Sequence, residues 1–238
     1  MAAPLSITWL GHSTFLIGLP SGKRVVTDPW LGNPNCPASF SKPESLKPVD
    51  AILVSHGHSD HLTDVVPLAR ATGAAVVCIF ELGEYLREKG LQNVQDMGIG
   101  GTQRVAGLSI TMTQAVHSGS TKDGGRIVYL GGAAGFILRA PDLPTIYFAG
   151  DTGLFGDMKL IGDFHKPDLV MMPIGGHFVM GPKEAALATK EYLKPKYVLP
   201  MHYGTSPQLA GTTAQYQEAL GTTPTKVFPI SPGEKVEF

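Results

Sequence analysis

Three histidines and an aspartate follow a short apolar run in the stretch ILVSHGHSDHLT, residues 52–63. Imidazole and carboxylate groups are the usual ligands for zinc and similar divalent ions. Four donors on so short a turn cannot easily all point at one ion. The spacing therefore indicates a divided site, in which His56 and His58 bind one metal ion and Asp60 and His61 bind a neighbouring one.

Two metal ions need further ligands, and the chain offers three candidates at the ends of other apolar runs. His117 stands in QAVHSGS, Asp151 in YFAGDTGLF and His202 in VLPMHYG. Taken alone, an aspartate beside a glycine, as Asp151 is, marks a turn as often as a ligand. Together with the first stretch, these residues complete a ligand set for a dinuclear site on one edge of the sheets.

The remaining histidines leave two interpretations open. His12 in LGHST and His177 in GGHFVMG each lie in a Gly-rich turn after a predicted strand. Such a histidine either holds its loop by hydrogen bonds or faces a pocket, where it binds substrate or donates a proton. We interpret His165 in GDFHKPD as a surface loop residue. Tyr203, beside His202, either contacts substrate or packs against its neighbours.

The elements that must position these residues are short. Apolar runs rich in Val, Ile and Thr predict strands, and apolar residues at helical spacing predict helices. The predicted strands cover residues 6–10, 14–19, 24–27, 51–54, 75–79, 108–114, 127–130, 135–139, 145–148, 169–172, 197–199 and 226–230. The predicted helices cover residues 62–71, 81–89, 183–193 and 213–220. Continuous apolar strands with interleaved helices imply two mixed sheets covered by helices.

Neither a linker nor a low-complexity tract interrupts this pattern, so we expect a single domain over residues 1–238. The Pro-rich stretch 29–48 is the longest irregular segment, and such a loop is often a functional rim or lid. We expect this loop, together with the loops at 117–125 and 175–181, to select the substrate.

Composition excludes several classes of function. The net charge is −1 and no run of Lys or Arg occurs, so we expect no nucleic-acid partner. No stretch of 18 apolar residues and no basic, apolar N-terminal leader occurs, so we expect neither a membrane span nor a signal peptide. Cys36 and Cys78 are most simply two free thiols in a reducing cytoplasm. Exposed strand edges would allow a homo-oligomer.

Over essentially its whole length, the sequence resembles the metallo-β-lactamase-fold hydrolases. The resemblance rests on the strand-end Asp28 in VVTDPWLGNP, the His-x-His-x-Asp-His signature, and three later ligand candidates in the family's order. Within that superfamily, ITWLGHSTFLI and MMPIGGHFVMGPKEA resemble the UPF0173 metal-dependent hydrolases. The ascorbate-6-phosphate lactonase is a relative of that family, and the N-acyl phosphatidylethanolamine phospholipase D group is a more distant one.

The resemblance implies a fold and an assignment of ligands. The fold is a four-layer αββα sandwich with the site at the edge between the sheets. Asp28 would lie behind the ligands and orient one of them. The resemblance assigns the first metal to His56, His58 and His117, the second to Asp60, His61 and His202, and a bridging position to Asp151.

The implied activity is hydrolysis of a small-molecule ester, lactone or phosphoester by a hydroxide that bridges two divalent ions. Asp60 or Asp151 would orient the hydroxide, and His12 or His177 could supply a proton to the leaving group. Zinc is the first choice of metal, with Mn²⁺, Ni²⁺ and Fe²⁺ as alternatives. The flavodiiron branch typically has a carboxylate at the position of His58, so the histidine favours hydrolysis over redox chemistry.

Two other functions stay open at this point. One is a metal-dependent phosphodiesterase or nuclease, which a positive surface stripe beside the metals would support. The other is a metal-binding protein without turnover, which a closed shell of protein ligands would support.

Overall fold

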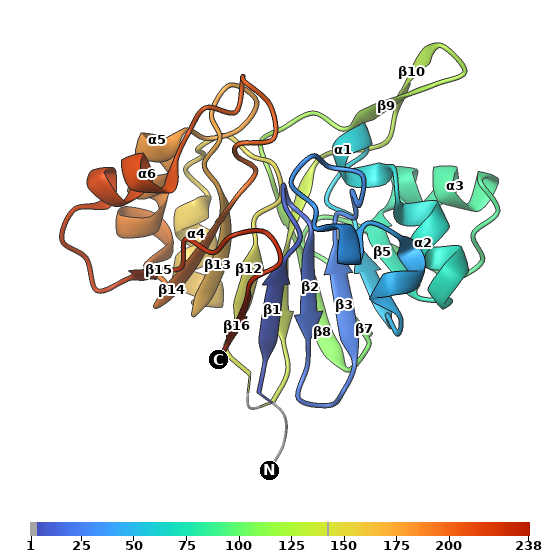
Figure 1. Cartoon of the computed structure of the whole chain (residues 1–238), viewed down its shortest axis with the longest axis horizontal. Coiled ribbons are helices and arrows are strands. Elements are labelled where there is room, and N and C mark those ends of the chain that lie inside the picture. Colours follow the sequence, from blue (N-terminus) through green and yellow to red (C-terminus); the bar gives the residue numbers. More distant parts are fainter. Residues whose placement is uncertain (1–3, 142) are drawn as a thin grey trace.

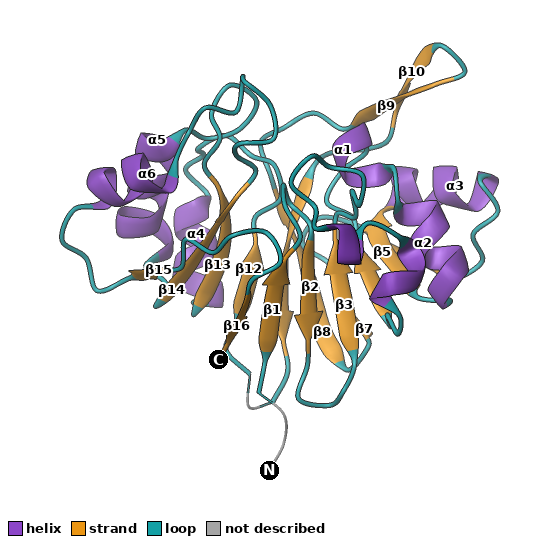
Figure 2. Ribbon diagram, viewed as in Figure 1, coloured by secondary structure: helices purple, strands orange, loops and turns teal. Residues whose placement is uncertain are grey.

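The computed structural model describes residues 4–141 and 143–238. In these residues two seven-stranded sheets lie face to face, and helices cover the outer face of each sheet (Figure 1). Colouring by secondary structure separates the layers, with helices on both flanks and strands between them (Figure 2). This helix–sheet–sheet–helix order confirms the predicted α/β fold class.

The first sheet combines an antiparallel half and a parallel half. Strands β16, β1, β2 and β3 pair antiparallel, and strands β3 to β6 pair parallel. In the register of β3 and β4, Thr27 lies opposite Leu53, so the segments that follow the two strands leave the sheet at the same edge. The spatial order is β16 (Lys235–Glu237), β1 (Ser6–Trp9), β2 (Phe15–Gly18), β3 (Arg24–Thr27), β4 (Ala51–Leu53), β5 (Ala75–Ile79) and β6 (Val94–Met97).

The second sheet has the same mixed character. Strands β7, β8, β11 and β12 pair antiparallel, and β12 to β15 pair parallel. Strands β8, β12 and β14 therefore run in the same direction and end at one edge. The spatial order is β15 (Lys226–Val227), β14 (Tyr197–Met201), β13 (Leu169–Pro173), β12 (Ile146–Phe148), β11 (Ala134–Arg139), β8 (Leu108–Gln114) and β7 (Thr102–Val105).

The helices divide between the two flanks. Those of the first sheet are α1 (Ser59–Leu62), α2 (Val65–Thr72) and α3 (Phe80–Glu88), and those of the second are α4 (Met158–His165), α5 (Pro182–Leu187) and α6 (Thr213–Leu220) (Figure 1). Helix α5 continues as a π-helical turn, η3 (Ala188–Leu193), and the Pro-rich loop holds the 3₁₀ turns η1 (Ala38–Phe40) and η2 (Pro43–Leu46). A separate hairpin, β9 (Ser120–Asp123) and β10 (Arg126–Tyr129), projects beyond α1 (Figure 1).

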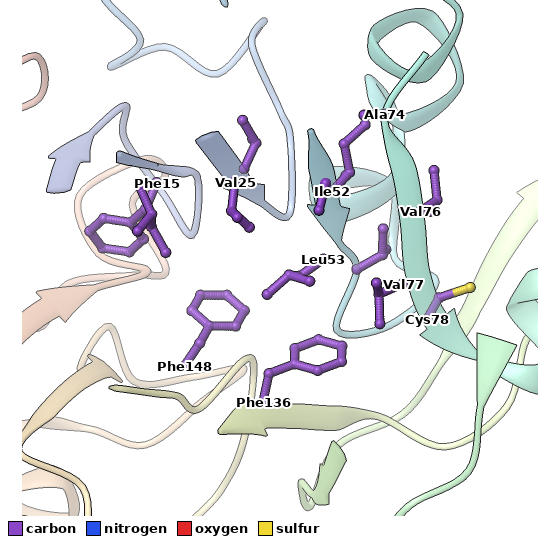
Figure 3. Packing of buried hydrophobic residues seen from close by; sticks show 14 of the residues in the cluster. Phe15, Val25, Ile52, Leu53, Ala74, Val76, Val77, Cys78, Phe136 and Phe148 are labelled. Carbon is purple, nitrogen blue, oxygen red and sulfur yellow. The ribbon is translucent and has the colours of Figure 1, made fainter. Parts of the chain in front are cut away.

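A continuous apolar core holds the two sheets together. Phe15 and Leu53 of the first sheet approach Phe136 and Phe148 of the second, and all four side chains are fully buried (Figure 3). Full burial of one such side chain contributes about 1.5–3 kcal/mol. A second cluster packs the other face of the second sheet against its helices. The core thereby fixes the strand ends of both sheets relative to one another.

Three predicted elements were wrong. The loop predicted around His165 is helix α4, and His165 is its last residue. The single helix predicted over 62–71 is two helices, because α1 already begins at Ser59 inside the candidate metal loop. The helix predicted over 183–193 is α-helical only to Leu187 and then widens into a π-helical turn.

Candidate metal centre

Loops at one edge of the two sheets carry all the predicted ligands. The segment that follows β4 bears the His-x-His-x-Asp-His signature, and its second half forms the short helix α1. His117 follows β8, Asp151 follows β12 and His202 follows β14. The two sheets also bond to each other here, because the Ala134 N–H donates to the Ser55 carbonyl over 3.0 Å.

A glycine allows these loops to approach closely. Gly150 has a φ of +62°, and a Cβ at this position would lie 2.6 Å from the Ala134 carbonyl oxygen and 2.9 Å from the Ser55 Cβ. A side chain here would therefore push the loop that carries Asp151 away from the loop that carries His56.

Three histidine nitrogens converge to form the first group. His56 Nε2 lies 2.9 Å from His58 Nδ1, which lies 3.2 Å from His117 Nε2. Nitrogens that share a tetrahedral zinc ion at about 2.0–2.1 Å are separated by roughly 3.3 Å. The three imidazoles are therefore spaced as ligands of one ion would be, and their donor atoms form one of the groups able to hold a metal.

The second group contains Asp60, His61 and His202, with His12 beside them. Asp60 Oδ2 lies 3.8 Å from His61 Nε2 and 3.9 Å from His202 Nε2. His61 and His202 are almost completely buried, whereas the Asp60 side chain keeps 33% of its surface exposed. Asp60 therefore stands on the solvent side of this group.

Asp151 lies between the two groups. Its Oδ2 atom is 2.8 Å from His202 Nε2 and 3.3 Å from His61 Nε2, both in the second group. The same oxygen is 3.7 Å from His117 Nε2 and 4.0 Å from His56 Nε2, both in the first. One carboxylate oxygen of Asp151 thus lies within 4.0 Å of imidazole nitrogens from both groups.

Unsatisfied buried atoms show that these residues fit a metal. Among the described residues, His61 Nε2, His202 Nε2 and Asp151 Oδ1 are buried without a hydrogen-bond partner. Asp151 approaches both imidazoles closely, but these pairs lack hydrogen-bond geometry. A buried polar atom left unpaired costs about 1–3 kcal/mol. Cations shared among these donors would satisfy all three atoms.

The buried carboxylate of Asp28 fixes one ligand in each group. Its Oδ1 accepts the Ser55 N–H over 2.7 Å, and its Oδ2 accepts the Ser55 hydroxyl over 2.6 Å and His61 Nδ1–H over 2.7 Å. Because the hydroxyl proton is directed at Asp28, the Ser55 oxygen accepts His56 Nδ1–H over 2.9 Å. These bonds assign the protons of both rings to Nδ1, which leaves Nε2 of His56 and His61 free for a metal.

The surroundings of His56 and His61 shift the pKa values of the two rings in opposite directions. Burial and the neighbouring His61 lower the pKa of His56 well below its ordinary value. Burial also opposes a charge on His61, but Asp151 and Asp28 on either side raise its pKa well above the ordinary value. Burial raises the pKa of Asp28 itself. A metal ion would replace the proton that His61 holds between two carboxylates.

His12 supports Asp60 from behind. His12 Nε2 lies 2.9 Å from Asp60 Oδ2, and its Nδ1 lies 2.8 Å from the Thr205 hydroxyl. Burial lowers the pKa of His12 to about 4, so the ring is neutral at pH 7 and donates Nε2–H to Asp60. The ring is only 1% exposed and does not line the cavity above the candidate ligands. The structure therefore brings His12 to the site, but not to its open side.

The cavity above the ligands has a volume of about 490 Å³. His58, Asp60, His117, Asp151 and His202 line it, together with Ser59, Ser118, Ser120, Thr121, Lys122 and Phe178. His177 does not line this cavity; it is exposed, with its ring against that of Phe178. Tyr203 stacks on Trp9 at 5.2 Å between ring centroids.

The sequence interpretation missed the hydroxyl groups that serve the ligands. Ser55 connects Asp28 to His56, and the Ser118 hydroxyl lies 3.2 Å from His58 Nε2. Thr205 supports His12. Ser55 could have been noticed because it separates the apolar run from the first histidine. Thr205 has no comparable signal in the sequence.

Comparison with known proteins identifies the family. Residues 23–203 match the Beta-lactamase superfamily domain. A UPF0173 metal-dependent hydrolase of Solibacter usitatus is 45% identical over 98% of this chain and 100% of its own length, and one of Koribacter versatilis is 43% identical over 97% of each chain. The chain belongs to the UPF0173 family of metal-dependent hydrolases. The resemblance predicted from its motifs is thereby confirmed.

A solved structure of a similar protein supports this assignment. Igni18, described as a novel metallo hydrolase from the archaeon Ignicoccus hospitalis, superposes with a TM-score of 0.86 over 99% of both chains and is 33% identical. This UPF0173 protein is thus a metal-dependent hydrolase of the metallo-β-lactamase superfamily. Within the described part of the chain, no helix has the length and apolar character required to cross a membrane.

Proposed function

We propose that this UPF0173 hydrolase is a single-domain enzyme that uses two divalent metal ions, zinc as the first choice, to hydrolyse an ester, lactone or phosphoester of a small molecule. The position of Asp151 is the observation that carries the proposal. One carboxylate oxygen within 4.0 Å of imidazole nitrogens from both groups is the arrangement expected of a bridging ligand.

Each group would hold one ion. The first ion would take His56, His58 and His117, and the second would take Asp60, His61 and His202. Two such ions supply a bound water with a pKa of about 7 and polarise the oxygen of the scissile group. Neither group contains cysteine, whereas structural zinc sites are typically closed by cysteine-rich tetrahedral sets.

The protein's own groups have separate tasks. Asp28 and Ser55 hold the proton positions of two ligand rings, so that their Nε2 lone pairs face the ions. His12 holds the Asp60 carboxylate, so in this proposal it is a positioning residue and not a proton donor to the leaving group. Asp60 and Asp151 both line the cavity and would orient the attacking water. A role for His177 stays a prediction.

The cavity favours turnover over simple metal storage. It opens directly above both groups and has the size of a small-molecule site, about 300–1,000 Å³. A protein that only held metal would need no such space beside its ligands.

The proposal is tested by metal content and turnover. Protein reconstituted with Zn²⁺ is assayed on aryl esters, lactones and bis(aryl) phosphodiesters, before and after removal of the metal by chelation. We expect about two ions per chain and activity that chelation abolishes. His58→Ala should lose most of the activity, whereas His165→Ala, on helix α4, should retain it. Activity that survives complete metal removal, or an unimpaired His58→Ala variant, would contradict the proposal.

A further inference from the structure

A second hollow adjoins the cavity above the candidate metal centre, beside the β9–β10 hairpin. This second hollow has a volume of about 420 Å³. Ser59, Thr121 and Lys122 line both spaces, so the two adjoin one another at these residues. Figure 1 shows the hairpin next to α1 and directed away from the body of the molecule. A molecule that extends from the metal centre past these three residues would reach the second hollow.

The second hollow is positively charged. Arg70 of α2, Lys89 and Lys122 of β9 line it, and no acidic side chain does. Lys89 is paired with Asp123, whose Oδ2 lies 2.6 Å from the ammonium nitrogen. Among the described residues, neither Arg70 nor Lys122 has a carboxylate within 4.0 Å. In a chain of net charge −1, two unpaired cations in one hollow form a local excess.

Backbone and aromatic contacts connect the elements that line the second hollow. The Arg70 guanidinium donates to the Lys89 carbonyl over 2.7 Å, which ties the end of α3 to α2. The Tyr85 hydroxyl donates to Asp123 over 3.3 Å, and the Lys89 ammonium lies 4.9 Å from the centre of the Tyr85 ring. Asp123 thereby attaches the hairpin to the end of α3, and the preceding residue, Lys122, lines both spaces.

The remaining lining of the second hollow is partly apolar. Leu62, Val66 and Leu86 contribute side chains between the cations. Val66 is half-buried and Leu62 keeps 8% of its surface exposed, whereas Leu86 is fully buried, so the first two supply the apolar surface of the hollow. An apolar floor with cations at its rim suits a short hydrocarbon stem that ends in a negative charge.

We propose that the substrate is a small anion, whose carboxylate or phosphate group occupies the hollow lined by Arg70, Lys89 and Lys122 while its scissile bond reaches the candidate metal centre. This inference rests on the proposed hydrolase function and names the substrate class for it. The negative group would bind equally in the ground state and the transition state, so Arg70 and Lys122 are specificity residues and not catalytic ones.

Two matched esters test the inference in turnover. The p-nitrophenyl monoester of glutaric acid carries a carboxylate where p-nitrophenyl valerate carries a methyl group. The measured quantity is the ratio of kcat/KM for the anionic ester to that for the neutral one. Because a partly exposed charge pair contributes up to about 1 kcal/mol, we expect this ratio to fall about 5-fold in Lys122→Met or Arg70→Gln and about 20-fold in the double variant. The loss should appear in KM.

Matched controls separate the hollow from the general surface charge. Lys23 lies in an exposed turn between β2 and β3, and Arg104 is exposed on β7. Lys23→Met and Arg104→Gln remove the same charges elsewhere and should leave the ratio within 2-fold of wild type. Higher salt should reduce the preference for the anionic ester in the wild type.

A binding experiment distinguishes this inference from the hydrolase proposal and separates the two anions. Valerate, monobutyl phosphate and 1-pentanol are titrated into the metal-loaded full chain by calorimetry. We expect at least one anion to bind more tightly than the alcohol, with about a 20-fold loss in the double variant. The anion with the larger loss identifies the natural group. If neither anion binds more weakly to the double variant, the inference is overturned even where esters are hydrolysed. If the anions bind the double variant more weakly but no ester is turned over, the inference about the anion stands and the proposal of ester hydrolysis fails.

Discussion

Replacement of Asp28 by asparagine should weaken both candidate metal sites at once. The amide has the shape of the carboxylate, but one of its two terminal atoms donates instead of accepts. The Ser55 N–H cannot reverse its role, so the amide oxygen must stay at the position of Oδ1. The amide nitrogen then faces the Ser55 hydroxyl and His61 Nδ1, which both donate to the carboxylate in the wild type.

Two ligand rings are expected to change their proton positions in response. His61 Nδ1 must become an acceptor, so its proton moves to Nε2, the atom that faces the second group. The Ser55 hydroxyl, now an acceptor toward the amide, donates to His56 Nδ1 and moves that proton to Nε2 as well. Loss of an outer-shell partner typically costs 10–100-fold in metal affinity, or about 1.4–2.7 kcal/mol. We expect a loss of this size at each site.

The assay is a titration of the metal-free protein with Zn²⁺ in competition with a chromogenic chelator. Asp50→Asn is the matched control. Asp50 Oδ2 also accepts a backbone N–H, that of Arg24, but Asp50 precedes β4, whereas Asp28 follows β3 at the edge that carries the donors. Metal-free Asp28→Asn should stay folded, since a neutral group replaces a carboxylate whose pKa burial already raises. Wild-type affinity at both sites would refute the reasoning, and a loss at one site only would show that Ser55 does not transmit the change.

Three further outcomes follow from the same structure. Ser55→Ala should weaken only the ion bound by His56, by about 10-fold in the same titration. Removal of a metal present at 1,000 times its Kd should lower the Tm by roughly 8–16 °C in calorimetry, because such binding adds about 4 kcal/mol; an unchanged Tm would argue against a folded-state site. Gly162→Ala should reduce the free energy of unfolding, measured in urea, by about 2–3 kcal/mol, because the added Cβ would overlap the Tyr192 carbonyl oxygen. The control Gly156→Ala has open space around the added Cβ and should change the free energy of unfolding by less than about 0.5 kcal/mol.

The fold was predictable where a strand is buried on both faces. The predicted strand at 75–79 is β5 residue for residue, because every side chain in it is buried and the sequence is continuously apolar. The polar strand β7 was missed, because this edge strand is mostly exposed and has no apolar pattern. Helix α4 was missed because it carries Gly162, which lowers helix propensity. That glycine is required by the π-helical turn η3, whose backbone leaves no space for a side chain.

The candidate site was predictable as a set of donors but not as a network. Strand direction brings His117, Asp151 and His202 to one edge, and that direction can be inferred from the order of strands and helices. Hydrogen-bond partners depend instead on where loops from different sheets meet. Nothing in the sequence places Thr205 beside His12, and a Gly-rich turn gave His12 and His177 the same signal although one is buried and the other exposed.

The two parts of the site differ in how firmly the fold holds them. The donors stand on strand ends that bond across the sheets, as in the bonds from Ala134 N–H to Ser55 and from His202 N–H to His12, each 3.0 Å long. The proposed anion hollow is instead bounded by a hairpin that projects beyond α1 and contacts the body through Asp123 and through the partly buried Val128. Changes in the hairpin can therefore alter the wall that selects the substrate while the spacing of the donors stays fixed. If the proposed hollow selects the substrate, chemistry and specificity are separable in this chain, and membership of the family need not imply a shared substrate.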